Sequence, residues 1–416
     1  MEKLLERTRG DKTIWSIVVI LSLVSVLAVY SSTGTLAYKM QHGNTAFYLF
    51  KQLMVLVFGI AIIYFAHKVN YTVYSKIAKI GFFFSIPLLI YTLIFGSHIN
   101  EASRWIRLPI INLTFQSSDL AKLALFMFVS RQLSKSQQVI RDFKKGYLPI
   151  FLSIITICIL IAPANLSTAL LLGSSCMLLC FMGRVRLKHI IGTILLAAIP
   201  LAILVAVAMI AYHPANTAEI LKTRHGHETL LTNVESRGRI GTWIKRVQDF
   251  IYTKHDEAPY QVQQAKIAIA NGGWIGRGPG NSEQRNFLPH PYSDFIFAII
   301  LEEYGWIGGF LLISFYLIFL FRSIRIYKKC PYAFGAFLAL GLSFTLVIQA
   351  LANMAVAVNL FPVTGVTLPL VSMGGSSIWF TSLAIGIILS VSRNVEEMEG
   401  NKTIEDLDKE LIPGVI

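Results

Sequence analysis

Asp294 stands where a polar stretch of the sequence gives way to an apolar one, a position that could hold a catalytic carboxylate. The residues before it read NFLPHPYS, and the run FIFAII begins directly after it. Such a carboxylate suits general base catalysis, and it equally suits the N-cap of a membrane helix. Glu302 and Glu303 follow about 12 Å further along the same expected helix, at about 1.5 Å per residue. This separation is too large for two carboxylates acting on one bond, so the glutamates are structural or proton-relay candidates.

A second polar group lies in RWIRLPIINLTFQSSDLAK, residues 104–122. Asp119 and Lys122 have the i,i+3 spacing that places two side chains on one helix face, where they can pair. Arg104, next to a tryptophan, is typical of a membrane interface. Two interpretations remain open: Asp119 caps a helix while Lys122 extends to the interface, or the group binds an anionic headgroup.

A third group combines basic residues with glycines in the stretches 235–243 and 260–294. Glycine turns between residues 272 and 280 could direct backbone N–H groups at a phosphate, and they could equally be plain turns. The basic and polar candidates for substrate binding in these stretches are Arg237, Arg239, Lys266, Asn281, Ser282 and Gln284.

The fourth group is NLFPVTGVTLPLVSMGGSS, residues 359–377, in which prolines and glycines interrupt an apolar sequence. Irregular backbone at membrane depth is tolerated only against protein or a water-filled cavity. The segment therefore predicts a cavity wall, with Ser376 and Ser377 at its end as further candidates for substrate binding.

The elements that must position these residues are membrane helices. Of the 416 residues, 54% are hydrophobic and 14% are charged, and the mean hydropathy is +0.60. Uninterrupted apolar runs of about 20 residues suit helices that cross a bilayer. They predict an all-α integral membrane protein, a polytopic bundle of about ten transmembrane helices. The expected helices are 14–30, 49–66, 80–96, 119–133, 148–163, 166–183, 189–211, 294–321, 333–359 and 376–392.

The loops set the orientation and the domain organisation. Alternate loops carry 19 Lys and Arg residues on one side, and the short loops on the other side carry four. Because cytoplasmic loops hold the excess, both termini are expected in the cytoplasm. Residues 1–393 form a single transmembrane domain with a large extracytoplasmic loop, about 213–293, between helices 7 and 8. Residues 394–416 form an acidic cytoplasmic tail. The net charge of +14 lies at helix ends, which indicates membrane lipids rather than nucleic acid as the partner.

At these motifs the chain resembles the SEDS family of peptidoglycan glycosyltransferases, which includes FtsW, RodA and a sporulation relative. The most specific pieces are residues 104–122, 276–309 and 361–377. The resemblance implies a polymerase that joins lipid II units into glycan strands on the outer face of the bacterial inner membrane. The family's catalytic carboxylate matches Asp294, with helix capping as a compatible second role.

The resemblance also implies a leaving group and a set of partners. The undecaprenyl pyrophosphate that leaves needs positive charge, for which Arg104, Lys122, Arg237, Arg239 and Lys266 are candidates. A divalent cation, Mg²⁺ or Mn²⁺, is compatible with this chemistry, although no residue pattern requires a metal. The expected protein partners are a class B penicillin-binding transpeptidase and other divisome membrane proteins.

The sequence departs from the family pattern and leaves alternatives. Asn165 stands where the family commonly has an acid, and Asp119 stands where it has the longer glutamate. The PANLSTA and LPHPYSDFIFAII variants and the extended cytoplasmic tail favour the FtsW-type division role over RodA-type elongation. A lipid II flippase would line a path through the membrane with ionisable residues, and a non-catalytic scaffold would not depend on Asp294.

Overall fold

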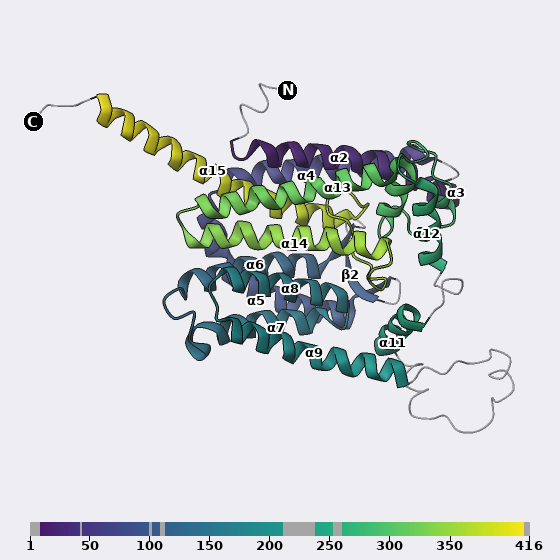
Figure 1. The fold of residues 1–416 in the computed structure, drawn as a ribbon, viewed down its shortest axis with the longest axis horizontal. Helices are drawn as coiled ribbons and strands as arrows, with labels where there is room; N and C mark the ends of the chain where they lie inside the picture. The colour runs from purple at the N-terminus through teal and green to yellow at the C-terminus, as the bar shows by residue number, and fades with distance from the viewer. Residues whose placement is uncertain are drawn as a thin grey trace, which may run out of the picture.

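The computed structural model describes residues 9–41, 44–99, 102–108, 113–210, 238–252 and 260–411 of the chain. Within them, ten long helices run side by side as one bundle (Figure 1), and each overlaps one of the ten predicted apolar runs. They are α2 (Lys12–Ser32), α4 (Thr45–Lys68), α5 (Tyr71–Phe95), α6 (Ser117–Lys135), α7 (Leu148–Ile161), α8 (Leu166–Met182), α9 (Leu187–Ile210), α13 (Ile296–Lys329), α14 (Ala333–Ala357) and α15 (Gly375–Leu411). The prediction of an all-α polytopic membrane protein is confirmed.

Eight of the described helical stretches are long and apolar enough to cross a membrane. Helix α8 has only 17 residues, and α6 carries charged residues at both ends. The charges of α6 are tolerated because this helix packs inside the bundle, against α5, α7 and α14. Asp119, Lys122 and Arg131 of α6 therefore face protein, whereas Lys135 at its end is exposed.

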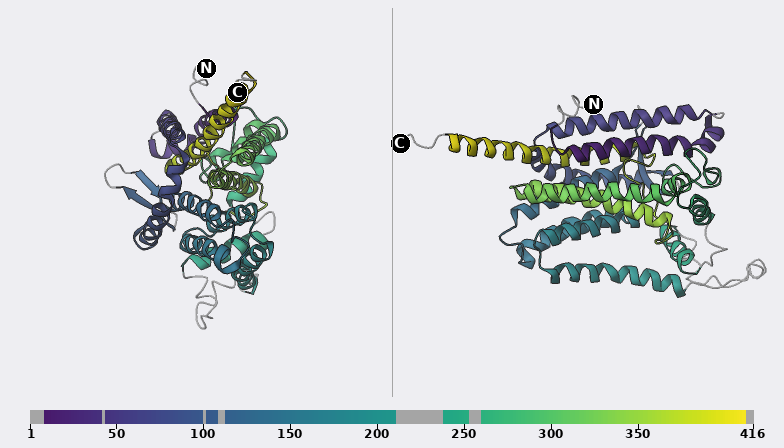
Figure 2. Two further views of the ribbon diagram at one scale, coloured as in Figure 1. Left: turned by 90° about the vertical axis from the view of Figure 1, so that its left-hand side faces the viewer. Right: turned by 45° about the horizontal axis from the view of Figure 1, so that its top comes forward.

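One end of the bundle carries the additional elements (Figures 1 and 2). They are α3 (Gly34–Gln41), α11 (Gly238–Tyr252), α12 (Tyr260–Gly272) and an antiparallel sheet in the order β1 (Ser97–Ile99), β2 (Ala102–Leu108), β3 (Leu113–Gln116). Two of these helices, α11 and α12, lie within the stretch predicted as one long loop, 213–293. That stretch is therefore partly helical, and the small sheet was not predicted at all.

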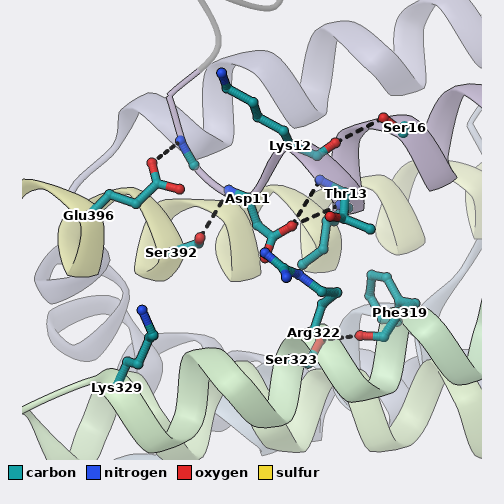
Figure 3. Close-up of polar contacts among 12 residues, drawn as sticks. Asp11, Lys12, Thr13, Ser16, Phe319, Arg322, Ser323, Lys329, Ser392 and Glu396 are labelled. Atoms are coloured by element: carbon teal, nitrogen blue, oxygen red, sulfur yellow. Dashed lines mark hydrogen bonds and ion pairs between the residues drawn. The ribbon is translucent and has the colours of Figure 1, made fainter.

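The opposite end of the bundle joins α2, α13 and α15 (Figure 3). Asp11 caps α2 by accepting from the backbone N–H of Thr13 at 2.9 Å and of Ile14 at 3.1 Å. The same carboxylate pairs with Arg322 of α13 at 2.6 Å, and the N–H of Asp11 donates to Ser392 of α15 at 3.0 Å. Helix α15 then leaves the bundle and runs on to Leu411 (Figure 1), into the region predicted as a solvated tail.

Residues 358–374, which we call the strap, link α14 to α15 as irregular backbone. Leu368, Leu370 and Val371 of the strap are almost fully buried. Side chains of the surrounding helices donate to strap carbonyls: Ser25 to Val371 at 2.8 Å, Tyr316 to Pro369 at 2.6 Å, Gln349 to Thr367 at 2.9 Å and Asn353 to Val366 at 2.7 Å. The predicted interruption of helical structure is confirmed, and these donors replace the bonds that a helix would supply. The segment was predicted as a cavity wall, whereas these strap residues lie against the side chains of the surrounding helices.

Helix α13 is interrupted at Gly305, whose φ is +65°. There its backbone pairs with the glycine-rich segment 272–278. The N–H groups of Arg277 and Gly278 donate to the carbonyls of Glu302 at 3.0 Å and Glu303 at 2.9 Å. A Cβ at Gly276 would lie 2.2 Å from the Glu303 carbonyl oxygen. The glycines thus permit two backbones to touch, and these N–H groups are committed to α13 rather than to a phosphate.

Candidate functional site

Asp294 lies two residues before α13, at the end of the bundle that carries α11 and α12. It is half-buried, and its Oδ1 accepts a hydrogen bond from the Ser293 hydroxyl at 3.2 Å. The N-cap of α13 is Phe295, which makes no side-chain capping bond. The expected capping role of Asp294 is therefore wrong, since the helix begins one residue too late for this side chain to hold the cap position.

Arg246 of α11 is one basic residue on which the charge of Asp294 acts. Burial lowers the pKa of the Arg246 guanidinium, and the negative charge of Asp294 acts in the opposite direction. The phenol of Tyr292 also lies in this field, and its pKa is raised by burial and then by the nearby groups Tyr48 and Asp294. A partly buried guanidinium on which the charge of a carboxylate acts can bind a phosphate or orient the carboxylate.

The sequence did not single out Arg246. It precedes Asp294 by 48 positions, and only the fold places its guanidinium within range of the Asp294 charge. The available signal was the pattern of α11, GRIGTWIKRVQDFIY, which has apolar residues at helical spacing with basic residues between them. That pattern predicts an amphipathic helix at the membrane surface without saying which charge faces the site.

Asp119 and Lys122 form the predicted ion pair, with 2.7 Å between Oδ1 and Nζ. Their side chains are 5% and 16% exposed, so the pair is held inside the protein and Lys122 does not extend to the interface. The N-cap of α6 is Gln116, which excludes the capping alternative for Asp119. Its second oxygen, Oδ2, is buried without a hydrogen-bond partner in the described part of the chain.

This ion pair faces a small cavity of about 40 Å³ between α6, α14 and α15. The polar residues that line the cavity with it are Thr345, Gln349, Ser377 and Thr381. The cavity thus offers a carboxylate oxygen, an ammonium and several hydroxyls on otherwise apolar walls. Such a combination can bind a polar group that both donates and accepts hydrogen bonds.

Ser376 and Ser377 have different environments although they are neighbours. Ser377 lines the cavity. The Ser376 side chain is buried, and its hydroxyl accepts from the backbone N–H of Gln116 at 3.3 Å. Ser376 therefore joins the start of α15 to the end of β3, while Ser377 remains a candidate for substrate binding.

The chain matches the sequence model of the FtsW, RodA and SpoVE family, described as cell cycle protein, over residues 11–397. The chain belongs to this family. It is 31% identical over 392 residues to a probable peptidoglycan glycosyltransferase FtsW of Trichlorobacter lovleyi, covering 93% of this chain and 94% of that protein. It is 29% identical over 395 residues to stage V sporulation protein E of Bacillus subtilis, covering 93% and 98%.

The fold is also shared with a chain of a peptidoglycan synthase complex, studied for how it coordinates polymerization and crosslinking. The TM-score is 0.66 at 22% sequence identity, and the match covers 93% of this chain and 98% of that chain. The SEDS resemblance that the motifs suggested is thus confirmed for this FtsW, RodA and SpoVE family member.

Glu302 and Glu303 of this family member hold the loop that leads to Asp294. Glu302 is fully buried, and its carboxylate accepts from the N–H groups of Glu283 and Gln284, each at 3.3 Å, and from the Ser282 hydroxyl. Glu303 accepts from the Ser31 hydroxyl of α2. These bonds favour the structural role for both glutamates.

The other predicted binding residues lie apart from this centre or outside the described side chains. Asn281 is exposed and donates to the Arg277 carbonyl at 3.1 Å, and Lys266 is half-buried on α12. Ser282 and the backbone of Gln284 are engaged by Glu302. Arg104 lies in β2 and Arg239 in the first turn of α11, where their side chains are not described, and Arg237 falls outside the described residues.

A divalent cation would find few protein ligands here. Across the described ranges, no group of three or more His, Cys, Asp or Glu side chains is close enough to hold one. Mg²⁺ commonly binds through one or two carboxylates and takes its remaining ligands from substrate phosphates and water. Asp294 fits that mode of binding only in combination with a phosphate-bearing substrate.

Proposed function

We propose that this protein is a peptidoglycan glycosyltransferase that polymerises lipid II on the outer face of the inner membrane, with Asp294 as general base. The observation that carries the proposal is the placement of the half-buried Asp294 carboxylate at the mouth of the bundle, in the field of Arg246. Membership of the FtsW, RodA and SpoVE family supports the same reaction. Relatives at about a third identity carry the name peptidoglycan glycosyltransferase.

In the proposed reaction, an acceptor sugar hydroxyl attacks the anomeric carbon of the donor. Asp294 takes the hydroxyl proton as the new carbon–oxygen bond forms. The bond between the anomeric carbon and the pyrophosphate oxygen breaks, and the electron pair leaves with the lipid pyrophosphate. A divalent cation, where bound, would neutralise part of this charge.

In this scheme Arg246 supplies positive charge for the leaving pyrophosphate. The further candidates for this role are Lys266, Arg239, Arg237 and Arg104. A guanidinium matches phosphate oxygens through two parallel hydrogen bonds. The Asp119–Lys122 pair and Ser377 would bind polar groups of the substrate in the neighbouring cavity. An uncharged Asn165 is compatible with this scheme, because its side chain caps α8 by accepting from the Thr168 N–H at 3.2 Å.

The proposed biological role is septal cell-wall synthesis, with both termini in the cytoplasm. The FtsW relative supports division, and RodA-type elongation is the alternative. The shared fold with a chain of a synthase complex that couples polymerization to crosslinking supports a class B penicillin-binding transpeptidase as partner. The remaining proposed partners are other divisome membrane proteins and membrane lipids.

The test is polymerisation of purified lipid II by the purified protein with its transpeptidase partner, whose crosslinking is blocked by a β-lactam. Wild type is expected to make long glycan strands. Asp294→Asn and Asp294→Ala are expected to make none while still folding and binding the partner. Strands of normal length from both variants would contradict the role of Asp294. Translocation of lipid II in vesicles without polymerisation by wild type would instead support a flippase.

A further inference from the structure

The three residues that end at Asp294 are held by an unusual arrangement of backbone hydrogen bonds. The carbonyl groups of Tyr292, Ser293 and Asp294 lie outside the hydrogen-bond ladder of α13 and must find hydrogen-bond donors elsewhere. Each accepts one bond from α14 or the strap: from the Met373 N–H at 2.9 Å, from the Ser372 hydroxyl at 2.6 Å and from the Asn353 side-chain amide at 2.9 Å, respectively. We call these three bonds the carbonyl clamp.

Two side chains of the carbonyl clamp, those of Asn353 and Ser372, each bond both to residues 293–294 and to the strap. Asn353 donates to the Val366 carbonyl at 2.7 Å as well as to Asp294. Ser372 accepts from the Leu368 N–H at 2.9 Å while its hydroxyl donates to Ser293. Both side chains are 1% exposed. Buried donors of this kind fix backbone geometry, because water cannot replace them when the backbone moves.

The carbonyl clamp acts on the position of the carboxylate rather than on its chemistry. From Phe295 onward the chain is fixed by α13, whose first turn is bonded to the Phe295 carbonyl. The clamp fixes the three residues before it. The backbone of Asp294 is therefore fixed by α13 on its C-terminal side and by the carbonyl clamp on its N-terminal side. This fixed backbone restricts the positions that the Asp294 carboxylate can reach.

We propose that Asn353 and Ser372 are positioning residues for glycan polymerisation, which set the reach of the Asp294 carboxylate toward the acceptor hydroxyl. This inference rests on the proposed function, in which Asp294 is the general base. Neither residue touches the reacting atoms. Because two of the three clamp bonds are donated by strap residues, the strap fixes the position of the general base at this end of the bundle.

The substitutions that test the carbonyl clamp change its donors with little change in volume. Asn353→Asp places a carboxylate oxygen against two carbonyl oxygens and removes both donated bonds. Ser372→Ala removes one donor and one acceptor, while Ser372→Thr keeps the hydroxyl. Ser343→Ala is the matched control, because Ser343 is a fully buried serine of α14 whose hydroxyl donates only to the Ala339 carbonyl of its own helix at 2.6 Å.

The first measurement is steady-state polymerisation of lipid II by the complex with the transpeptidase. In Asn353→Asp and Ser372→Ala, kcat is expected to fall about 10- to 100-fold, the size expected when a reacting group is displaced by about 1 Å. KM should stay within about threefold, since ground-state binding is unchanged. Ser372→Thr should restore most of the activity, and Ser343→Ala should match wild type.

The second measurement is amide hydrogen exchange of peptides that cover residues 288–300, in the same complex. Both clamp variants should exchange faster there than wild type, and Ser343→Ala should not. Faster exchange with an unchanged kcat would overturn the proposal, as would a raised KM with an unchanged kcat. If Asn353→Asp does not fold, the Ser372→Ala and Ser372→Thr pair decides alone. Activity in Asp294→Asn would overturn the proposed function itself, independently of either clamp variant.

Discussion

Lys122 pairs with Asp119 inside the bundle, at 2.7 Å, rather than reaching to the membrane interface. Both residues lie on α6 and face the cavity that α6 shares with α14 and α15. The Asp119 side chain is the more deeply buried of the two, and one of its oxygens has no partner within the described residues. The pair therefore places a charged carboxylate in the protein interior, which is unfavourable for stability, and leaves one of its oxygens free to accept a hydrogen bond beside the cavity.

A double-mutant cycle at Asp119 and Lys122 separates the contribution of the pair to stability from its contribution to substrate binding. Lys122→Met leaves a buried carboxylate without its partner and is expected to destabilise the protein by roughly 3–5 kcal/mol. Adding Asp119→Asn should restore most of the stability, because the charge is then removed. Polymerisation should remain low in the double variant if the pair binds substrate. Full activity in the stable double variant would show that the pair is structural only.

Substitution of Arg246 is expected to lower the rate of polymerisation more than substitution of its sequence neighbour Lys245. Arg246→Ala should lower kcat about 10- to 100-fold, because it removes positive charge from the region where the leaving pyrophosphate develops charge. Arg246→Lys should recover only part, since lysine lacks the planar fork of donors. Lys245→Ala is the matched control, a basic residue that is exposed on the same helix. Equal effects of Arg246→Ala and Lys245→Ala on the rate would argue for general surface charge rather than for a defined site.

Two substitutions of Glu302 distinguish a structural role of its carboxylate from a role as a proton relay. Glu302→Gln keeps an oxygen that can accept from the N–H groups of Glu283 and Gln284, so polymerisation should fall by less than about fivefold. Glu302→Ala removes the acceptor altogether and should loosen the loop, with a much larger loss of activity. Rates for both variants, and hydrogen exchange across residues 280–290, are the measurements. A relay would show the reverse of this pattern, with Glu302→Gln as inactive as Glu302→Ala.

The helices were predictable from the sequence because each apolar run must satisfy its own backbone in lipid. The hydrogen-bond and charge partners of particular residues were not predictable from the sequence. The glycines at 272–278 suggested a phosphate-binding turn, and nothing local indicated that α13 would pass within contact distance and take up those N–H groups. The electrostatic interaction of Arg246 with Asp294 and the hydrogen bond of Asn353 to the Asp294 carbonyl likewise join residues that are far apart in the sequence. Asp294 was identifiable because its position at the boundary of an apolar run is itself a sequence signal.

The junction at the opposite end of the bundle offers a test of stability without catalysis. Asp11 caps α2 and also pairs with Arg322, whose side chain is 29% exposed. Asp11→Asn keeps an oxygen for the cap and loses the charge pair. Asp11→Ala loses both, and the missing cap alone is worth about 1 kcal/mol. Thermal unfolding in detergent should therefore show a larger drop for Asp11→Ala than for Asp11→Asn.

Per folded molecule, polymerisation by both Asp11 variants should stay near the wild-type rate, because Asp294 comes just before α13 begins, whereas Arg322 lies near the other end of this helix. Arg9→Ala is a suitable control, since Arg9 pairs with Glu397 at 3.2 Å while its side chain is 71% exposed. Exposed pairs contribute about 0–1 kcal/mol, so this variant should unfold close to the wild-type temperature. A lower turnover in Asp11→Asn at full folding would instead show that the junction is coupled to the Asp294 site through α2 or α13.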